Sequence, residues 1–245
     1  MKFSHSLMAT ATMVSALTLA ASGAMAAEDE SPYGSISGTV TFTNDYVFRG
    51  ISLSDEHPAI QGSIDWSHPS GFNAGVWGSS IDLPGHLELD YYAGFSGEVQ
   101  SLSYGFTVVY YTYPYSGAND EYWEGIGTVG YDFGFLSTTL GVGYSPKQAS
   151  LGHDDATWVF GDVNIPIPGA DDFSPYVFGH LGYQDAAFGP GGYYEWNGGA
   201  GFSLVGLDFK LMYIDTDEKD DPLTPAFKEN DNTDARFVFL ISKSM

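Results

Sequence analysis

The chain has 245 residues, of which 31 are acidic and 8 are basic, so its formal net charge is −23. A surface this acidic repels nucleic-acid phosphates, which excludes nucleic acid as a partner. The chain has no cysteine, so the fold must be held without disulfides.

Residues 1–26 predict a secretory signal peptide. Lys2 precedes an apolar, small-residue-rich stretch from Leu7 to Ala21, and Ala24-Met25-Ala26 has the small-x-small pattern of a cleavage site. An amphipathic leader or a short anchor helix is the alternative. No later stretch approaches the roughly 18 apolar residues of a membrane helix. We therefore expect export and a mature domain of residues 27–245, which is periplasmic, secreted or an outer-membrane barrel.

The segment from Gly34 to Gly50 alternates between apolar and polar side chains. Such a period of two predicts a strand with one apolar and one polar face. A strand of an ordinary globular protein has about five or six residues, whereas a tilted strand needs roughly nine to eleven to cross a bilayer. We expect this first strand to end near Arg49. The apolar positions are Ile36, Val40, Phe42, Tyr46 and Phe48.

The same pattern recurs along the chain and predicts an all-β fold, a single closed antiparallel transmembrane β-barrel of about twelve strands. Merging two strands of weak polarity contrast would give ten. Closure is expected because an open sheet edge leaves backbone groups unsatisfied in lipid. The further strands are expected at residues 58–68, 72–83, 86–99, 102–114, 121–133, 136–146, 156–166, 173–185, 193–204, 207–215 and 234–245.

The connections between these segments fall into two classes. Alternate ones are short, such as Pro69-Ser70-Gly71 and Val205-Gly206, whereas the others are mostly longer and acidic, with Pro84-Gly85 as an exception. Outer-membrane barrels have short periplasmic turns and longer extracellular loops. We therefore expect the long acidic connections, above all residues 216–234, to lie outside the cell.

The polar faces of the clearest strands predict which side chains line the lumen. With the apolar face toward lipid, Asp45, Arg49, Asp65, Glu88 and Asp90 point inward. A lumen dominated by carboxylates favours cations over anions. The alternative is that these groups pair with Arg49 and Lys210 and fill a narrow barrel. On strands where the alternation is less clear, the residues also expected to point inward are Glu124, Asp132, Asp162, His180, Gln184, Asp208 and Lys210.

Arg49 is expected at the outer end of the first strand, on the same face as Asp45. It could act as a selectivity element near the mouth, or form a static ion pair with Asp45.

Four segments carry a family resemblance: residues 43–52 (TNDYVFRGIS), 58–65 (PAIQGSID), 71–79 (GFNAGVWGS) and 88–94 (ELDYYAG). Together they resemble the TorF family of porins, also described as the Gcw_chp domain. The resemblance implies an outer-membrane barrel that passes small hydrophilic solutes. Such a barrel would meet outer-membrane lipid, lipopolysaccharide and the barrel-assembly machinery.

Three other functions stay open. A soluble periplasmic barrel that binds a small ligand would point its aromatic faces into a core and its polar faces outward. A barrel without conductance could serve a structural or adhesion role. A hydrolase at the rim could act through His153 and its neighbours Asp154 and Asp155, but the chain has no nucleophile elbow and no His-Glu-x-x-His motif. We predict that the protein is not an enzyme and uses no cofactor.

The acidic segment after Thr216 offers weak metal candidates, Asp217, Asp220 and Asp221. Oxygen-rich clusters attract hard divalent cations. Counted from Asp215, however, the glycine and glutamate positions of an EF-hand loop hold Asp220 and Ala226. We therefore predict no specific metal site in this segment.

Overall fold

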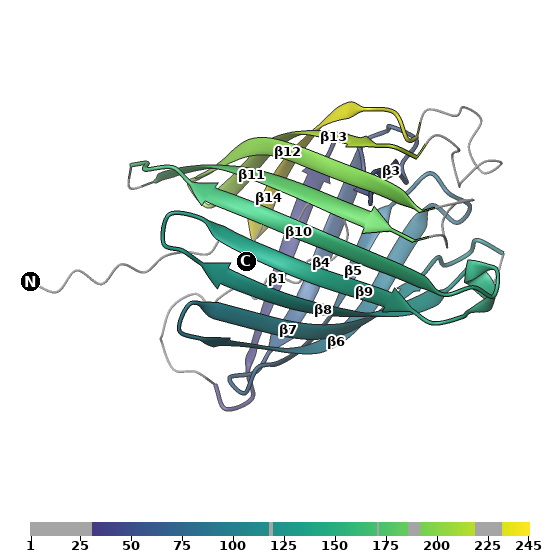
Figure 1. The fold of residues 1–245 in the computed structure, drawn as a ribbon, viewed down its shortest axis with the longest axis horizontal. Coiled ribbons are helices and arrows are strands. Elements are labelled where there is room, and N and C mark those ends of the chain that lie inside the picture. The colour runs from purple at the N-terminus through teal and green to yellow at the C-terminus, as the bar shows by residue number, and fades with distance from the viewer. Residues whose placement is uncertain (1–30, 118–119, 171, 186–191, 219–231) are drawn as a thin grey trace, which may run out of the picture.

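A computed structural model describes residues 31–117, 120–170, 172–185, 192–218 and 232–245. They form a closed antiparallel barrel of twelve strands, as predicted (Figure 1). No helix in these residues is long and apolar enough to cross a membrane. The strands are β1 (Ser35–Thr43), β4 (Ala59–Ser67), β5 (Phe72–Ser80), β6 (Leu87–Val99), β7 (Leu102–Thr112), β8 (Tyr122–Asp132), β9 (Ser137–Ser145), β10 (Ala156–Pro166), β11 (Phe173–Gln184), β12 (Tyr193–Leu204), β13 (Leu207–Thr216) and β14 (Arg236–Ser244).

Each strand of the barrel pairs with its neighbours in chain order, and β1 closes the barrel by pairing with both β4 and β14. The register places Thr43 opposite Ala59 on one side of β1 and opposite Leu240 on the other. All strand edges of the barrel are thereby paired, which satisfies the backbone groups that lipid cannot.

The connections mark two ends of the barrel. One end, which we call the short-turn end, has the connections 68–71, 100–101, 133–136, 167–172 and 205–206. The opposite end, which we call the long-connection end, has the connections 44–58, 81–86, 113–121, 146–155, 185–192 and 217–235. A single turn of 3-10 helix, Ala149–Leu151, lies in one of the long connections.

The first long connection corrects the prediction of a strand that continues to Arg49. β1 ends at Thr43, and the chain turns inward to form a separate hairpin from β2 (Val47–Phe48) and β3 (Ile51–Ser52). We call Val47–Ser52 the inner hairpin. Asn44 ends the ladder, because its side-chain oxygen accepts a hydrogen bond from the backbone N–H of Phe239 at 2.6 Å.

The turn of the inner hairpin consists of Arg49 and Gly50. Their φ angles are +47° and +82°, and two positive φ angles in a two-residue loop are typical of the type I′ turn of tight hairpins. Side chains on and around the hairpin are buried, with Phe48, Ile51 and Leu53 each at most 7% exposed. The alternation seen in the sequence is real, but it continues through a bend, so it describes two elements instead of one.

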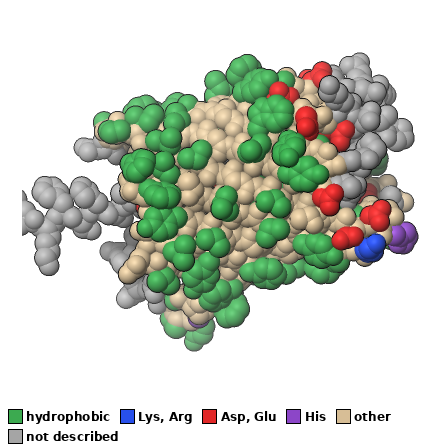
Figure 2. All heavy atoms as spheres, viewed as in Figure 1, with side chains coloured by type: hydrophobic (Ala, Val, Ile, Leu, Met, Phe, Trp, Pro, Cys, Tyr) green, Lys and Arg blue, Asp and Glu red, His purple; other side chains and the backbone are tan. Residues whose placement is uncertain are grey.

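The outer wall of the barrel is apolar. Figure 2 shows hydrophobic side chains spread over it, while acidic side chains gather toward one end. Ile36, Ile64 and Leu140 are 77%, 62% and 68% exposed, whereas Glu88, Asp90 and Glu195 are fully buried. This arrangement is the reverse of the one a soluble barrel requires, and is the one expected in lipid.

Candidate functional site

The inner hairpin places Arg49 inside the barrel, toward its long-connection end. Its guanidinium bonds to Glu124 of β8 and donates from Nη1 to Gln184 Oε1 of β11 at 2.7 Å. The same guanidinium lies over the ring of Trp158 in β10, 4.1 Å from the ring centroid. Arg49 is only 1% exposed, and its contacts connect the inner hairpin to three strands of the barrel wall. All three partners lie at the ends of their strands that meet the long connections. Arg49 therefore lies toward the mouth as expected, but on the inner hairpin and not on the first strand.

Asp45 anchors the base of the inner hairpin. Its carboxylate accepts hydrogen bonds from Ser52 Oγ at 2.6 Å and Ser54 Oγ at 2.9 Å, and it pairs with Arg236 Nη1 of β14 at 3.0 Å. The expected ion pair between Asp45 and Arg49 is thus not formed, because the chain reverses at residues 49 and 50 and carries the guanidinium to Glu124.

A second polar cluster surrounds His180 in β11. One ring nitrogen lies 2.6 Å from Asp162 Oδ1 of β10, and the other lies 2.7 Å from Glu195 Oε1 of β12. Trp158 Nε1 also donates to Glu195, at 3.2 Å. The register of β10 and β11 explains the first contact, because Asp162 and His180 are directly opposite. The sequence pointed to Asp162 and His180 but missed Glu195, which the alternation of β12 could have indicated.

Glu88 and Asp90 lie on the inner face of β6 and are both fully buried. Tyr113 donates a hydrogen bond to Glu88 Oε1 at 3.3 Å. Within the described residues, Glu88 Oε2 and both carboxylate oxygens of Asp90 have no hydrogen-bond partner. Two buried carboxylates with incomplete hydrogen bonding are costly to keep ionised, so each is stabilised either by a proton or by a nearby cation.

Asp65 lies nearer the short-turn end, on β4. It accepts hydrogen bonds from Tyr92 of β6 and from Ser63 Oγ at 2.7 Å. The tyrosine reaches Asp65 across β5, which places this carboxylate on the same inner surface as Glu88 and Asp90.

The described interior therefore holds more carboxylates than basic side chains. Each basic side chain has an acidic partner: Arg49 has Glu124, Arg236 has Asp45, and Lys210 Nζ lies 3.6 Å from Asp208 Oδ2. The expected pairing of carboxylates with Arg49 and Lys210 thus occurs, but with Glu124 and Asp208, and it leaves the pair on β6 uncompensated. The remaining inward carboxylates are Asp65, Glu88, Asp90, Asp162 and Glu195.

The residues of the hydrolase hypothesis do not converge. His153 follows the 3-10 turn of the long connection after β9 and is exposed. Among the described residues its ring makes no hydrogen bond or ion pair with a carboxylate or hydroxyl, while Asp154 and Asp155 lie within 3.9 Å of Lys147 Nζ. General base catalysis needs such a contact, so this geometry gives the hypothesis no support.

Two groups of residues bear on metal binding. Asp217 Oδ1 accepts a hydrogen bond from the backbone N–H of Tyr194 at 2.6 Å, whereas Asp220 and Asp221 lie outside the described residues. A separate group at the long-connection end, Asp55, His57 and Asp82, could hold a metal ion.

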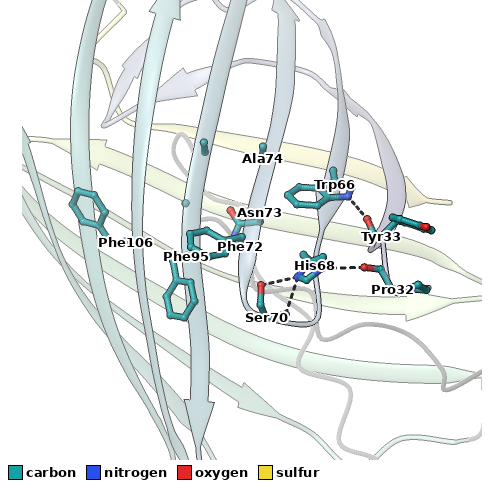
Figure 3. Close-up of a pocket in the computed structure, with 12 residues that line it drawn as sticks. Pro32, Tyr33, Trp66, His68, Ser70, Phe72, Asn73, Ala74, Phe95 and Phe106 are labelled. Carbon is teal, nitrogen blue, oxygen red and sulfur yellow. Dashed lines mark hydrogen bonds between the residues drawn. The ribbon is translucent and has the colours of Figure 1, made fainter. Parts of the chain in front are cut away.

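A shallow groove lies on the outer wall at the short-turn end (Figure 3). Trp66 Nε1 donates to the carbonyl oxygen of Tyr33 at 2.8 Å, and one ring nitrogen of His68 lies 2.6 Å from Ser70 Oγ. Phe72 and Phe95 form part of its apolar lining. Aromatic rings with a polar edge are typical of the membrane interface, and Trp66 has this arrangement on the outer wall.

Comparisons with known proteins place this geometry in context. Residues 26–245 match the model of a family described as "Bacterial protein of unknown function (Gcw_chp)". No curated protein matches the chain.

Among solved structures, the NanC porin aligns with 85% of this chain and 98% of its own, at 8% identity and a TM-score of 0.50. The KdgM porin aligns with 85% of this chain and 96% of its own, at 8% identity and a TM-score of 0.53. KdgM in complex with disordered oligogalacturonate aligns with 86% of this chain and 98% of its own, at 8% identity and a TM-score of 0.52. At these identities the likeness establishes a porin-like fold. The Gcw_chp resemblance is confirmed, and the TorF name stays a prediction.

Proposed function

The chain belongs to the Gcw_chp family and folds as a porin-like barrel, and from this premise we propose that it is an outer-membrane channel. Small hydrophilic solutes diffuse through it passively, and cations pass in preference to anions. The barrel shape, the apolar outer wall and the buried polar and charged side chains support the channel. A cluster of buried apolar side chains that includes Phe48, Tyr111 and Phe160 fills part of the interior.

One observation carries the cation preference: Glu88 and Asp90 lie on the inner wall without a basic partner among the described residues, and in this proposal both are ionised. Charged rings select ions of opposite sign in channels, and their field is stronger where water is scarce. Together with Asp65 they set the potential of the lumen. Asp45, by contrast, is tied to Arg236 and holds the inner hairpin in place.

The inner hairpin narrows the route. Arg49 lies inside the barrel toward the long-connection end and is held by Glu124 and Gln184, so it limits the size of the solute and weakens the negative field locally. A barrel that this hairpin closes completely would be a structural or adhesion protein. The closed barrel is the second candidate, and the burial of Phe48, Ile51 and Leu53 favours it.

The charge of the lumen also bears on the class of solute. KdgM has been solved with oligogalacturonate, which is a polyanion. In this chain the inward carboxylates would repel a polyanion, so the proposed solutes are cationic or neutral.

The apolar outer wall indicates which partners the barrel contacts. The wall contacts outer-membrane lipid, and we extend the proposal to lipopolysaccharide around the long-connection end and to the barrel-assembly machinery during insertion. Residues 1–26, which lie outside the described residues, act as the export signal in this proposal, and N-terminal sequencing of the mature protein checks the cleavage site.

Swelling of liposomes that contain the purified protein tests the function. Glucosamine, glucose and glucuronate are sugars of similar size that are respectively cationic, neutral and anionic. We expect uptake rates in that order, and a smaller difference between them in Glu88→Gln/Asp90→Asn. Asp154→Asn removes an exposed carboxylate as the matched control and should leave the order unchanged.

The swelling rates distinguish the channel from the structural or adhesion barrel. Absence of swelling with all three sugars would leave the structural or adhesion barrel. Equal uptake of the three sugars would mean that pairing or protonation neutralises the lumen carboxylates, and faster uptake of glucuronate would contradict the cation preference.

A further inference from the structure

Two segments at the long-connection end bring histidine and aspartate side chains together. Asp55 and His57 lie in the return from β3 to β4, and Asp82 and His86 lie in the connection from β5 to β6. The backbone N–H of Asp82 donates to the carbonyl oxygen of Leu53 at 2.9 Å, which fixes the two segments against each other. This group is separate from the lumen carboxylates.

The potential ligand atoms of three of these residues converge. One ligand atom from each of Asp55, His57 and Asp82 lies within 4.8 Å of the other two. His57 Nδ1 lies 3.7 Å from Asp82 Oδ2, and on the other side of the same carboxylate His86 Nδ1 lies 3.7 Å from Oδ1. Within the described ranges, this is the one set of three metal-ligating side chains with such spacing.

These distances are close to those around a bound metal. Zinc binds histidine nitrogens and carboxylate oxygens at about 2.0–2.2 Å, so neighbouring ligands of a tetrahedral ion are about 3.3 Å apart. The ligand atoms of Asp55, His57 and Asp82 lie within 4.8 Å of one another, so they must move closer to hold an ion. The side chains of His57 and Asp82 are 69% and 43% exposed, which leaves them room to rotate.

The neighbouring acidic side chain points elsewhere. Glu56 lies between Asp55 and His57 in the chain, but its Oε1 pairs with Arg236 Nη1 at 3.2 Å. The group is therefore not a general accumulation of carboxylates. Its two imidazoles on one carboxylate distinguish it from the oxygen-only sets that suit calcium and magnesium.

We propose that Asp55, His57 and Asp82 bind a divalent transition-metal cation of the zinc type, with His86 holding Asp82 in position from its second oxygen. Ligating carboxylates commonly have such a supporting partner. The fourth coordination position faces solvent and takes water. Because the ligands come from both sides of the contact between Asp82 and Leu53, the bound ion ties the base of the inner hairpin to the connection between β5 and β6.

Isothermal titration calorimetry tests the site: ZnCl2 is titrated into the full-length protein in detergent, in the presence of excess MgCl2. Excess magnesium occupies carboxylates that attract cations only by charge, so the remaining heat reports the nitrogen-containing site. We expect one zinc ion per chain. His57→Ala and Asp82→Asn should each weaken binding at least tenfold, and His86→Ala should weaken it by a smaller factor.

His153→Ala is the matched control, because His153 is also an exposed histidine beside two aspartates at the same end of the barrel, and it should leave zinc binding unchanged. Far-UV circular dichroism of each variant checks that the barrel is folded. The proposal is overturned if the wild type binds no zinc, or if folded His57→Ala and Asp82→Asn bind it as tightly as the wild type. It is also overturned if His153→Ala weakens binding as much as His57→Ala. None of these results depends on whether the barrel conducts, so they are independent of the proposed channel.

Discussion

At the scale of single residues, Arg49 links the hairpin to the barrel wall. It combines a buried ion pair to Glu124, a hydrogen bond to Gln184 and a contact with the face of Trp158. The desolvation cost of a buried ion pair is offset only while both partners are present, so the loss of one partner leaves a buried charge. Arg49 should therefore matter more for stability than any exposed basic residue.

We expect Arg49→Ala to lower the free energy of unfolding by about 3–5 kcal/mol, because it leaves Glu124 buried without its cation. Arg49→Ala/Glu124→Gln should recover part of this loss, since the orphaned charge is then removed. Urea unfolding of the protein in lipid vesicles, followed by tryptophan fluorescence, measures both variants.

Lys147→Ala is the control for that experiment. Lys147 is exposed and lies 3.9 Å from the carboxylates of Asp154 and Asp155, and such surface pairs contribute about 0–1 kcal/mol. If Arg49→Ala is no more destabilising than Lys147→Ala, the guanidinium is not the link described here.

Alternation in the sequence predicts inward side chains where the backbone is regular and does not predict them where it bends. Alternation predicts that Glu88 and Asp90 point inward, and both are buried on β6. The place of Arg49 on the inner hairpin could not be predicted, because a period of two continues through Tyr46 and Phe48 although β1 ends at Thr43. The turn is Arg-Gly, not the Asn-Gly or Asp-Gly that usually indicates a two-residue hairpin. The partners of Arg49 are 75 and 135 residues away, a separation that local patterns do not encode.

At the scale of elements, the inner hairpin restricts the lumen. Gly50 is the position on which its turn depends, because its φ is +82° and an added Cβ would lie 2.9 Å from Thr216 Cβ and 3.0 Å from Glu195 Cβ. A side chain at this position is disfavoured both by the backbone and by the barrel wall.

Gly50→Val should therefore displace the inner hairpin while the barrel strands stay paired. We expect single-channel conductance to rise several-fold in a planar bilayer. Gly127→Val is the matched control, since Gly127 lies in β8 without a positive φ, and a Cβ added there would meet no atom within 4 Å. Equal conductance of Gly50→Val and the wild type would show that the hairpin does not limit the channel.

At the scale of the whole molecule, the difference between the two ends of the barrel is the basis for the orientation that we expect in the outer membrane. The long-connection end carries the acidic loops and the proposed zinc site, and the short-turn end carries the aromatic groove of Figure 3. The strand order and the two classes of connection could be predicted from the sequence because both follow from local alternation and turn residues. The acidic segment after Glu218 lies outside the described residues, so its expected exposure outside the cell stays a prediction.

Cysteine labelling tests this orientation, and the cysteine-free chain provides a background without thiols. We expect Asp154→Cys to react with a membrane-impermeant maleimide on intact cells, because it lies in a long connection that we place outside. Ser70→Cys, in a turn at the opposite end, should react only after the outer membrane is breached. The reverse pattern would invert the topology.

Conduction of cations through the barrel, favoured by its inward carboxylates, is the property on which the proposed function depends. It is tested by the reversal potential of the purified wild-type protein in a planar bilayer, recorded with KCl at different concentrations on the two sides. We predict a measurable conductance and a reversal potential displaced toward the equilibrium potential of potassium. A reversal potential displaced toward that of chloride, or the absence of any conductance, would contradict the proposed cation-preferring channel.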